Sequence, residues 1–482
     1  MSTLSPDTQH LVAVVGAGPA GLFAARELAA HGVHVVMFNR DIKPGGLAEY
    51  GIYPDKLRMK AGLREQFYQT LASENIEYYG NVTVGREVGL SLQDLHQLGF
   101  QAVLVTVGAQ GTKWLGLPGE NLAGVYHAKD LVYHYNGLPP YSQRTFKIGK
   151  RVVLIGVGNV MLDITHYLID ELKVDEVIAI ARRGPGEIKF DRNELATVIS
   201  NLDMQALDEE FERVAPVMSS LGENPSQPKA FILSALPKAT PGKAPTRFRL
   251  KFLLSPTRIL GDSLGRVIGL ECEQNTLVMQ DGEIKSQGLG TYEVLDVDTV
   301  IFAIGDNVDE NIGLPVERGA FVKSPTPLFP IEGISYELYD IQAQHSLPGM
   351  FVAGWSRQAS RGLVGVARKD GTSGARALLE YLHSLPSSNG VALQKVHARI
   401  QALAGPVIDK DDLVLLRALE MEKAAALGQA DFRYRTNEDM LDALQTWTRE
   451  NGSQGADLLQ RPDPQQKWQR LSDQRPLHSE KP

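Results

Sequence analysis

Three glycines near the start of the chain, Gly16, Gly18 and Gly21, have the spacing of a dinucleotide-binding turn within Gly-Ala-Gly-Pro-Ala-Gly. In such a turn the first glycine permits a tight bend, and the second lets the backbone approach a pyrophosphate. The third lets the following helix pack closely on the preceding strand. The sequence therefore predicts that these glycines, with Pro19 between them, hold a dinucleotide at the start of a helix.

The next expected contact is with the adenosine ribose, at the end of the second strand of the same unit. An acidic side chain usually occupies this place, but here the residues are Asn39 and Arg40. An asparagine amide can still hydrogen-bond a diol, without the charge that strengthens a carboxylate contact. We expect Asn39 and Arg40 to lie at the ribose and to bind it more weakly than a carboxylate would.

A second glycine-rich turn follows about 140 residues later, with Gly156 and Gly158 in Gly-Val-Gly-Asn-Val-Met. The larger Met161 stands where the third glycine of the pattern would be. A second turn of this kind predicts a second dinucleotide site in the same chain.

Two arginines, Arg182 and Arg183, follow the strand that should end beside the ribose of this second nucleotide. A 2'-phosphate carries up to two negative charges, which two guanidinium groups can hold. An acidic residue there would instead favour the unphosphorylated ribose. The sequence thus favours NADPH over NADH at the second site.

Each turn needs a strand before it, a helix after it and a second parallel strand. Apolar runs and helical spacing predict these elements in both units, over residues 11–15, 22–31 and 33–38, and over residues 151–155, 160–172 and 177–180. Further apolar runs end in glycine at Gly108, Gly305 and Gly354. The last of these runs indicates that a late segment completes the first domain, which is then discontinuous.

These elements predict an α/β fold with two nested doubly wound, Rossmann-like dinucleotide-binding domains and a helical C-terminal segment. The expected boundaries are 1–108 and 339–390 for the domain of the first glycine turn and 109–338 for the NADPH-binding domain of the second, with an excursion at 205–245. A helical segment should follow at 391–448, including a charged amphipathic helix over 410–428. Residues 449–482 are polar and are expected to form a mobile tail.

Composition agrees with this organisation. The chain has 482 residues, 43% of them hydrophobic, and a formal net charge of -8. This length favours two or three domains, and the mild acidity argues against nucleic acid as a partner. The first ten residues show no signal or transit peptide, and no run approaches the roughly 20 apolar residues of a membrane span. We expect a cytoplasmic protein.

The chain contains one cysteine, Cys272, which excludes an internal dithiol pair or an iron-sulfur cluster. Two different nucleotide sites suggest a flavin in one and a nicotinamide in the other, exchanging a hydride. Without thiols to store them, the electrons of a reduced flavin must leave for an external acceptor. This reasoning excludes the disulfide-reductase branch of two-nucleotide flavoproteins.

Several motifs together resemble adrenodoxin reductase and the bacterial ferredoxin-NADP reductases of that type. They are Gly45-Gly46-Leu47, Tyr50-Gly51-Ile52, Pro54-Asp55, Tyr79-Gly80-Asn81-Val82, the turn at 156–163, Arg182-Arg183-Gly184-Pro185, Glu194-Leu195 and Gly354-Trp355. The resemblance covers roughly residues 11 to 440. Its most specific motif is Gly354-Trp355, because most two-nucleotide flavoproteins have Gly-Asp there.

The resemblance implies an NADPH-oxidising FAD enzyme that passes electrons singly to a ferredoxin-like iron-sulfur protein. It also implies site residues, carried over by motif. FAD contacts are expected from Ala20, Asn39, Gly46, Leu47, Val84, Gly108, Gly354, Trp355, Gly365 and Val366. NADP contacts are expected from Gly158, Asn159, Val160, Arg182, Arg183, Glu194 and Gly365.

The chain departs from the family at positions linked to proton movement. A histidine near the flavin is replaced by Lys56, and a glutamate three residues after Glu194 is replaced by Thr197. Lys56 and Trp355 are the candidate catalytic residues, although a loop lysine is more often simply a solvated cation. Hydride transfer between stacked rings needs no side-chain acid or base, so neither replacement blocks that step.

An acidic ferredoxin would require a basic surface on this acidic protein. Candidate cations are Lys229, Lys238, Lys243, Arg247, Arg249 and Lys251, although scattered surface lysines and arginines are an equally good interpretation. Two alternatives stay open. One is an NADPH-oxidising subunit of a larger complex, like the glutamate synthase small subunit, serving a dedicated partner enzyme. The other is a flavin oxidase or oxygenase acting on an organic substrate.

Overall fold

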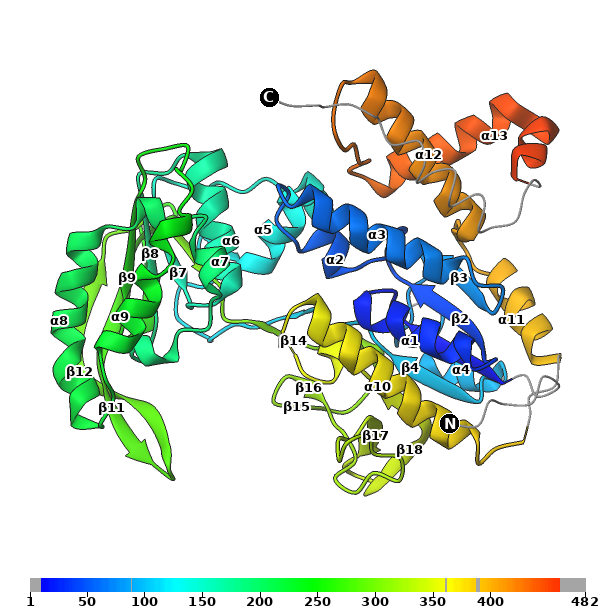
Figure 1. Cartoon of the computed structure of the whole chain (residues 1–482), viewed down its shortest axis with the longest axis horizontal. Helices are drawn as coiled ribbons and strands as arrows, with labels where there is room; N and C mark the ends of the chain where they lie inside the picture. Colours follow the sequence, from blue (N-terminus) through cyan, green and yellow to red (C-terminus); the bar gives the residue numbers. More distant parts are fainter. Residues whose placement is uncertain (1–9, 88, 360–361, 387–390, 460–482) are drawn as a thin grey trace. The chain divides into compact units, whose positions relative to one another are not determined.

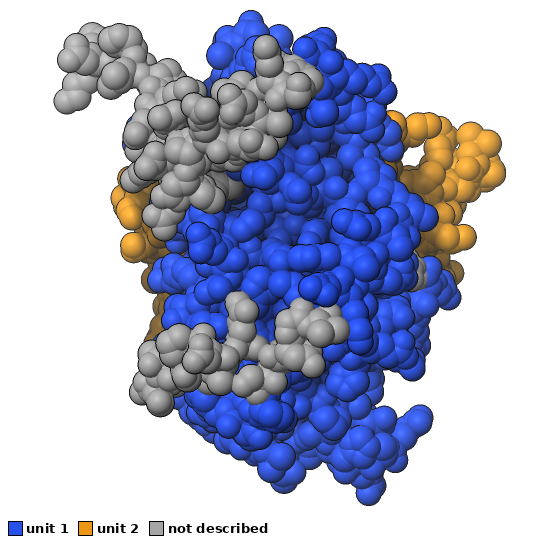
Figure 2. All heavy atoms as spheres, turned by 90° about the vertical axis from the view of Figure 1, so that its right-hand side faces the viewer, with its two compact units in different colours: residues 1–111, 133–143, 306–482 blue, residues 112–132, 144–305 orange. Residues whose placement is uncertain are grey.

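The computed structural model describes residues 10–87, 89–359, 362–386 and 391–459, which form two compact units. Unit 1 contains residues 1–111, 133–143 and 306–482, and unit 2 contains residues 112–132 and 144–305. Figure 2 colours unit 1 blue and unit 2 orange. Unit 1 is thus made of three separate stretches of the chain. The chain returns to unit 1 at Asp306, whereas the sequence placed the return at 339.

Unit 1 is built on a six-stranded sheet in the order β17-β18-β4-β1-β2-β3, which is parallel except for β17. Its strands are β1 (Leu11–Val15), β2 (His34–Asn39), β3 (Ile76–Gly80), β4 (Ala102–Val105), β17 (Glu337–Asp340) and β18 (His345–Val352). Because β18 lies beside β4, the late segment completes the sheet that the N-terminal residues begin.

Alternate residues of β1 face opposite sides of this sheet, so both faces are apolar and both are covered. Val12 and Val14 face a core that includes α1 (Pro19–Ala30), α3 (Leu57–Leu71), α10 (Val364–Leu382) and α12 (Lys410–Ala426). Ala13 and Val15 face a second core with α4 (Leu92–Gln97) and α11 (Val391–Gln401). Figure 1 shows α1 and α10 side by side on one face, and these two helices are in contact.

Unit 2 has a five-stranded parallel sheet in the order β6-β13-β7-β8-β9. Its strands are β6 (Val125–His127), β7 (Arg151–Ile155), β8 (Glu176–Ile180), β9 (Arg247–Lys251) and β13 (Thr299–Phe302). A three-stranded antiparallel sheet follows, with β10 (Leu254–Gly261), β11 (Val267–Gln280) and β12 (Glu283–Leu295). In Figure 1, β11 and β12 form a long hairpin at the lower left.

Along the chain, most helices of unit 2 occur between its parallel strands. They are α6 (Asn159–Tyr167), α7 (Arg192–Leu195), α8 (Met204–Ser220) and α9 (Ser226–Leu233), and α5 (Ala128–Tyr135) runs from unit 2 into unit 1. The expected excursion at 205–245 is therefore mostly helical. Its helix α8 buries Leu207, Phe211, Val214 and Met218 on one face.

The remaining elements are short or C-terminal. They are α2 (Leu47–Tyr50), α13 (Asn437–Leu459), β5 (Gly111–Thr112), β14 (Asp306–Asn307), β15 (Val316–Glu317) and β16 (Ala320–Phe321). The charged helix expected at 410–428 is α12. Helix α13 runs beyond the expected boundary at 448, and the rest of the expected tail, 460–482, lies outside the described residues. Among the described helices, none has the length and apolarity to cross a bilayer.

Candidate functional site

The glycine turn of unit 1 forms where β1 meets α1. Gly16 has a φ of +104°, and a Cβ on it would lie 2.7 Å from the backbone carbonyl of Thr106, so only glycine fits. Thr106 fixes the turn further because its Oγ1 donates to the Gly16 carbonyl at 2.7 Å. At Gly21, a Cβ would lie 2.1 Å from the Gly16 carbonyl oxygen. The first and third glycines therefore have the packing roles that the sequence predicted.

Gly18 differs from both because a Cβ on it would meet no atom within 4 Å. It directly precedes α1, which starts at Pro19, and it offers no side chain to cap the helix. The first backbone N–H groups of a helix lack intrahelical acceptors and carry partial positive charge. This turn thus presents open backbone donors of the kind that bind a pyrophosphate.

Two later segments close around this turn. Gly46 has a φ of +49°, and a Cβ on it would lie 3.1 Å from the Gly18 Cα, so the 45–46 loop packs on the turn. A Cβ on Gly354 would lie 2.6 Å from the Cβ of Ala20. In addition, the Gly354 N–H donates to the Asp370 carboxylate at 2.6 Å, which fixes the Gly-Trp segment to α10.

Asn39 does not have the free amide that the sequence analysis assigned to a ribose. Its Oδ1 accepts from the Ala17 N–H at 3.0 Å. Its Nδ2 lies within hydrogen-bond distance of the carbonyls of Asp41 and Lys43, at 2.8 and 3.1 Å, and of the Tyr78 hydroxyl. Since the side chain is only 8% exposed and its amide already has these partners, Asn39 ties the glycine turn to the 41–43 loop.

The other candidate FAD residues lie in several segments of unit 1. Trp355 lies half-buried in the 3-10 turn after β18, and the Gly108 N–H donates to the neighbouring Ser356 hydroxyl at 2.8 Å. Val84 is buried and Leu47 half-buried. At the start of α10, Val366 is 50% exposed, and a Cβ on Gly365 would meet no atom within 4 Å. Arg40 is exposed, with its Nε 3.3 Å from Asp41.

The sequence singled out Lys56, but the buried lysine of this region is Lys60. Lys56 is the half-buried residue before α3. The Lys60 amine donates to the carbonyl of Ile52 at 2.9 Å and to Asn136 Oδ1 at 2.6 Å. Burial, followed by the nearby positive charge of Arg433, lowers the pKa of Lys60 to about 7. No motif indicated this residue, because its burial depends on residues 133–143 joining unit 1.

The glycine turn of unit 2 repeats the geometry of the first. Gly156 has a φ of +124°, and a Cβ on it would lie 2.3 Å from the Ala303 carbonyl oxygen. A Cβ on Gly158 would again meet no atom within 4 Å, and α6 begins at the next residue. Met161 is fully buried where the third glycine would be. Val160 is 41% exposed at this helix start.

The two arginines after β8 have different surroundings. Arg183 pairs with Glu187 at 3.0 Å, whereas Arg182 is exposed and its side chain has no partner among the described residues. Lys189 is a cation that the sequence analysis missed. Its N–H donates to the Val157 carbonyl at 3.2 Å, so the 185–191 loop lies against the glycine turn. Its side chain is exposed.

The two remaining candidates lie on the same side of unit 2. Asn159 Oδ1 accepts from the Asp191 N–H at 2.7 Å and so connects α6 to the loop before α7. Glu194 lies half-buried on α7. Thr197 donates from its hydroxyl to the Glu194 carbonyl at 2.7 Å, a local contact that a glutamate could not make as a donor.

The six cations proposed as a basic surface are largely neutralised. Lys229, Lys243, Arg247, Arg249 and Lys251 each pair with a carboxylate at 3.3 Å or less, and Lys238 donates to Asn193. These ion pairs favour the interpretation of these residues as scattered surface cations over that of a basic partner surface. The distribution of charges along the sequence could not reveal these pairs, since most of the acidic partners come from distant segments.

Cys272 cannot serve as a redox thiol in this fold. It is fully buried in β11, and burial raises its pKa to about 12. A thiol in that state is neutral and inaccessible at physiological pH.

Comparison with known proteins gives consistent relatives. Residues 10–197 match the family model described as pyridine nucleotide-disulphide oxidoreductase. The mitochondrial NADPH:adrenodoxin oxidoreductase of Arabidopsis thaliana is 30% identical over 390 residues, which are 73% of this chain and 78% of that protein. The NADPH-ferredoxin reductase FprA of Mycobacterium leprae is 28% identical over 410 residues, 79% of this chain and 85% of that protein.

The fold has a solved counterpart. The structure of Mycobacterium tuberculosis FprA in complex with NADPH superimposes with a TM-score of 0.74 at 24% identity. The match covers 91% of this chain and 99% of that one. At this identity the superposition establishes the fold alone.

Proposed function

Because the chain belongs to the NADPH:adrenodoxin oxidoreductase family, we propose that it is an FAD-dependent reductase that takes hydride from NADPH and passes electrons singly to a ferredoxin-like iron-sulfur protein. The observation that carries this proposal is the pair of open glycine turns, one in each unit, at Gly18 and Gly158. Nothing in the comparisons favours a glutamate synthase-like subunit or an organic-substrate oxygenase.

Unit 1 is the proposed FAD unit. Its turn fits a pyrophosphate because Gly18 leaves open space beside the N-terminus of α1. Gly46 and Gly354 bring two further backbone segments to the same turn. When bound, FAD supplies the chemistry that accepts a hydride and releases single electrons.

Unit 2 is the proposed NADPH unit. Gly158 and the first turn of α6 would hold the pyrophosphate, and Arg182, exposed at the end of β8, would hold the 2'-phosphate. Lys189 lies on the loop against the same turn and would add a second positive charge. Arg183 contributes less because Glu187 already neutralises it.

The residues of the chain mainly bind and orient in this proposal. Hydride passes directly between rings, so it needs no proton from Lys56 or Thr197. Trp355, fixed to α10 through the bond between Gly354 and Asp370, is proposed to contact the flavin. With its single thiol buried, the chain has no cysteine on which electrons could be stored.

The proposal includes a cytoplasmic location. The relatives include both mitochondrial and bacterial enzymes, so the location needs a test of its own. Fractionation of the source cells, with an antibody against the chain, would locate it directly.

Anaerobic stopped-flow reduction tests the function. Holoenzyme mixed with NADPH should lose its oxidised flavin absorbance faster than with NADH, and reduced enzyme should then reduce an added ferredoxin. Failure of both nucleotides to reduce the flavin would refute the proposal. Reduction by NADPH without electron transfer to any of several ferredoxins would refute its acceptor half.

A further inference from the structure

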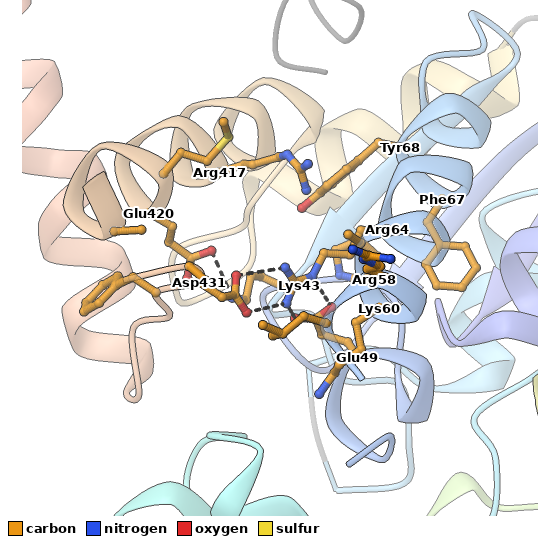
Figure 3. Close-up of a pocket in the computed structure, with 17 residues that line it drawn as sticks. Lys43, Glu49, Arg58, Lys60, Arg64, Phe67, Tyr68, Arg417, Glu420 and Asp431 are labelled. Atoms are coloured by element: carbon orange, nitrogen blue, oxygen red, sulfur yellow. Dashed lines mark hydrogen bonds and ion pairs between the residues drawn. The ribbon is translucent and has the colours of Figure 1, made fainter. Parts of the chain in front are cut away.

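A pocket of about 340 Å³ lies in unit 1, and its lining includes no residue of the glycine turn. Figure 3 shows it between α12 on the left and α3 on the right. Residues 430–432 form a third wall, and Lys43 and Pro44 lie at its base, directly before the Gly45–Gly46 loop. Its size is at the lower end of the range for small-molecule sites, about 300 to 1,000 Å³.

The charges that line the pocket are unequal. Five basic and three acidic side chains contribute: Lys43, Arg58, Lys60, Arg64 and Arg417 against Glu49, Glu420 and Asp431. All three carboxylates are already paired. Arg64 bonds Glu49 at 2.7 Å and Asp431 at 3.0 Å, and Lys43 bonds Glu420 at 2.8 Å. Arg433, outside the lining, bonds Glu49 and Asp431 as well.

Within the described residues, two guanidinium groups of the lining, those of Arg58 and Arg417, have no carboxylate partner. Arg58 is exposed on α3, and no ion pair or hydrogen bond of its side chain occurs within the described parts of the chain. Arg417 of α12 lies over the Tyr68 ring, 4.8 Å from its centroid. A guanidinium stacked in this way keeps its N–H edges available for a planar acceptor.

Lys60 contributes only part of a positive charge to the same pocket. Its amine bonds only neutral oxygens, of Ile52 and Asn136. Burial and the neighbouring charge of Arg433 lower its pKa to about 7, so it is charged only part of the time near neutral pH. The permanent excess charge thus belongs to Arg58 and Arg417.

The remaining walls are apolar and aromatic. They are formed by Pro44, Leu57, Ala61, Phe67, Tyr68, Met421, Ala424, Ala430 and Phe432. An inorganic ion would leave these walls in contact with water, whereas a ligand with an apolar body would cover them. The three resident carboxylates also disfavour a ligand with several negative charges.

We propose that this pocket binds an organic monoanion, an aromatic or arylalkyl carboxylate whose carboxylate faces Arg58 and Arg417 and whose ring packs on the apolar walls. None of the residues that line the pocket belongs to either glycine turn. The pocket lies behind the loop that closes the proposed FAD turn, since the Gly45 N–H donates to the Ala17 carbonyl at 2.7 Å.

Calorimetric titration of the holoenzyme tests the site, with NADP+ saturating so that the nucleotide site is blocked. The probes are 3-phenylpropionate and its neutral amide, which has the same shape without the charge. We expect saturable binding of the acid below 10 mM and at least tenfold weaker binding of the amide. Absence of acid binding in this range, or equal binding of the amide, would overturn the proposal.

Arginine variants locate the binding. Arg58→Gln and Arg417→Gln should each raise the dissociation constant of 3-phenylpropionate by at least fivefold. Arg26→Gln is the matched control, since Arg26 is exposed and lies 5.1 Å from the Phe23 ring centroid but does not line the pocket. If both pocket variants kept wild-type affinity, or the control lost as much, the assignment would be wrong. Arg58→Gln carries the test if Arg417→Gln does not fold.

Discussion

Arg64 of α3 holds Glu49 of α2 through two parallel hydrogen bonds, from Nε at 2.7 Å and from a terminal nitrogen at 2.9 Å. The same guanidinium bonds Asp431, far away in the sequence, at 3.0 and 3.2 Å. One arginine therefore connects the helix after the Gly45–Gly46 loop to the C-terminal segment. Such bidentate pairs are the strongest ion pairs in proteins when their remaining bonds are satisfied.

The Glu49 cluster should make the protein sensitive to acid. Despite its burial, the charges of Arg64 and Arg433 hold the pKa of Glu49 at about 2, against a usual value of 4.5. This depressed pKa contributes stability that is fully present above pH 4.5 and is lost as the pH falls towards 2. Urea unfolding of the wild type, followed by fluorescence across this pH range, should show the decline.

Removal of the charge should flatten that profile. Glu49→Gln leaves two partly buried arginines without this buried partner and should lower stability at pH 7 by about 3 kcal/mol. Its stability should then decline less than that of the wild type between pH 4.5 and 2, and the decline that remains should come from other carboxylates such as Glu77, whose pKa is also lowered to about 2. An unchanged acid profile in the variant would show that Glu49 is not the group responsible.

The two arginines after β8 should have unequal effects on nucleotide binding. Arg182→Ala should weaken NADPH by about 1 to 3 kcal/mol, the range for a charged hydrogen bond, and leave NADH almost unaffected. Arg183→Ala is the matched comparison. It should lose less NADPH affinity than Arg182→Ala, because Glu187 already pairs with Arg183. The dissociation constants of NADPH and NADH, measured for the wild type and both variants, test this prediction. Equal losses of NADPH and NADH in Arg182→Ala would contradict the 2'-phosphate assignment.

The glycines of the first turn should separate folding from binding. Gly16→Ala places a Cβ 2.7 Å from the Thr106 backbone at a φ of +104°, so we expect little folded protein. Gly18→Ala meets no protein atom and should fold, but its methyl group would occupy the space beside the pyrophosphate. Thermal melting and FAD retention on gel filtration measure the two effects. A Gly18→Ala protein that retained FAD like the wild type would argue against this turn as the FAD site.

Replacing Asn39 by the aspartate usual at this position should harm the protein. The Asn39 Nδ2 donates to the carbonyls of Asp41 and Lys43, and an aspartate oxygen would face these acceptors with no hydrogen to donate. Asn39→Asp should therefore cost about 1 to 3 kcal/mol of folding free energy at pH 7. Chemical unfolding measures it. Equal stability with tighter FAD binding would instead support a ribose-binding role for residue 39.

Much of the proposed chemistry could be predicted from local sequence. Gly16 and Gly156 are required by a tight turn between a strand and a helix, a constraint set within a few residues, and the structure has both turns where they were expected. The open positions at Gly18 and Gly158 follow from the same local geometry. Parallel strand order follows from the alternation of strands and helices.

Other features depend on contacts between distant segments and could not be read from the chain. Asn39 looked like a ribose contact, and only the fold shows that its amide is used by Ala17, Asp41 and Lys43. Lys60 is buried because Asn136 comes from a segment between the two parts of unit 2.

The sequence by itself determined the two nucleotide turns, the preference for a phosphorylated nicotinamide and the lack of an internal thiol pair, because each depends on residue type and short-range spacing. The tertiary structure decided which charges are free. Arg182, Arg58 and Arg417 lack carboxylate partners among the described residues, whereas Arg183 and most of the expected basic surface have them. A charge acts on a ligand only to the extent that its neighbours leave it uncompensated, and those neighbours are brought together only by folding.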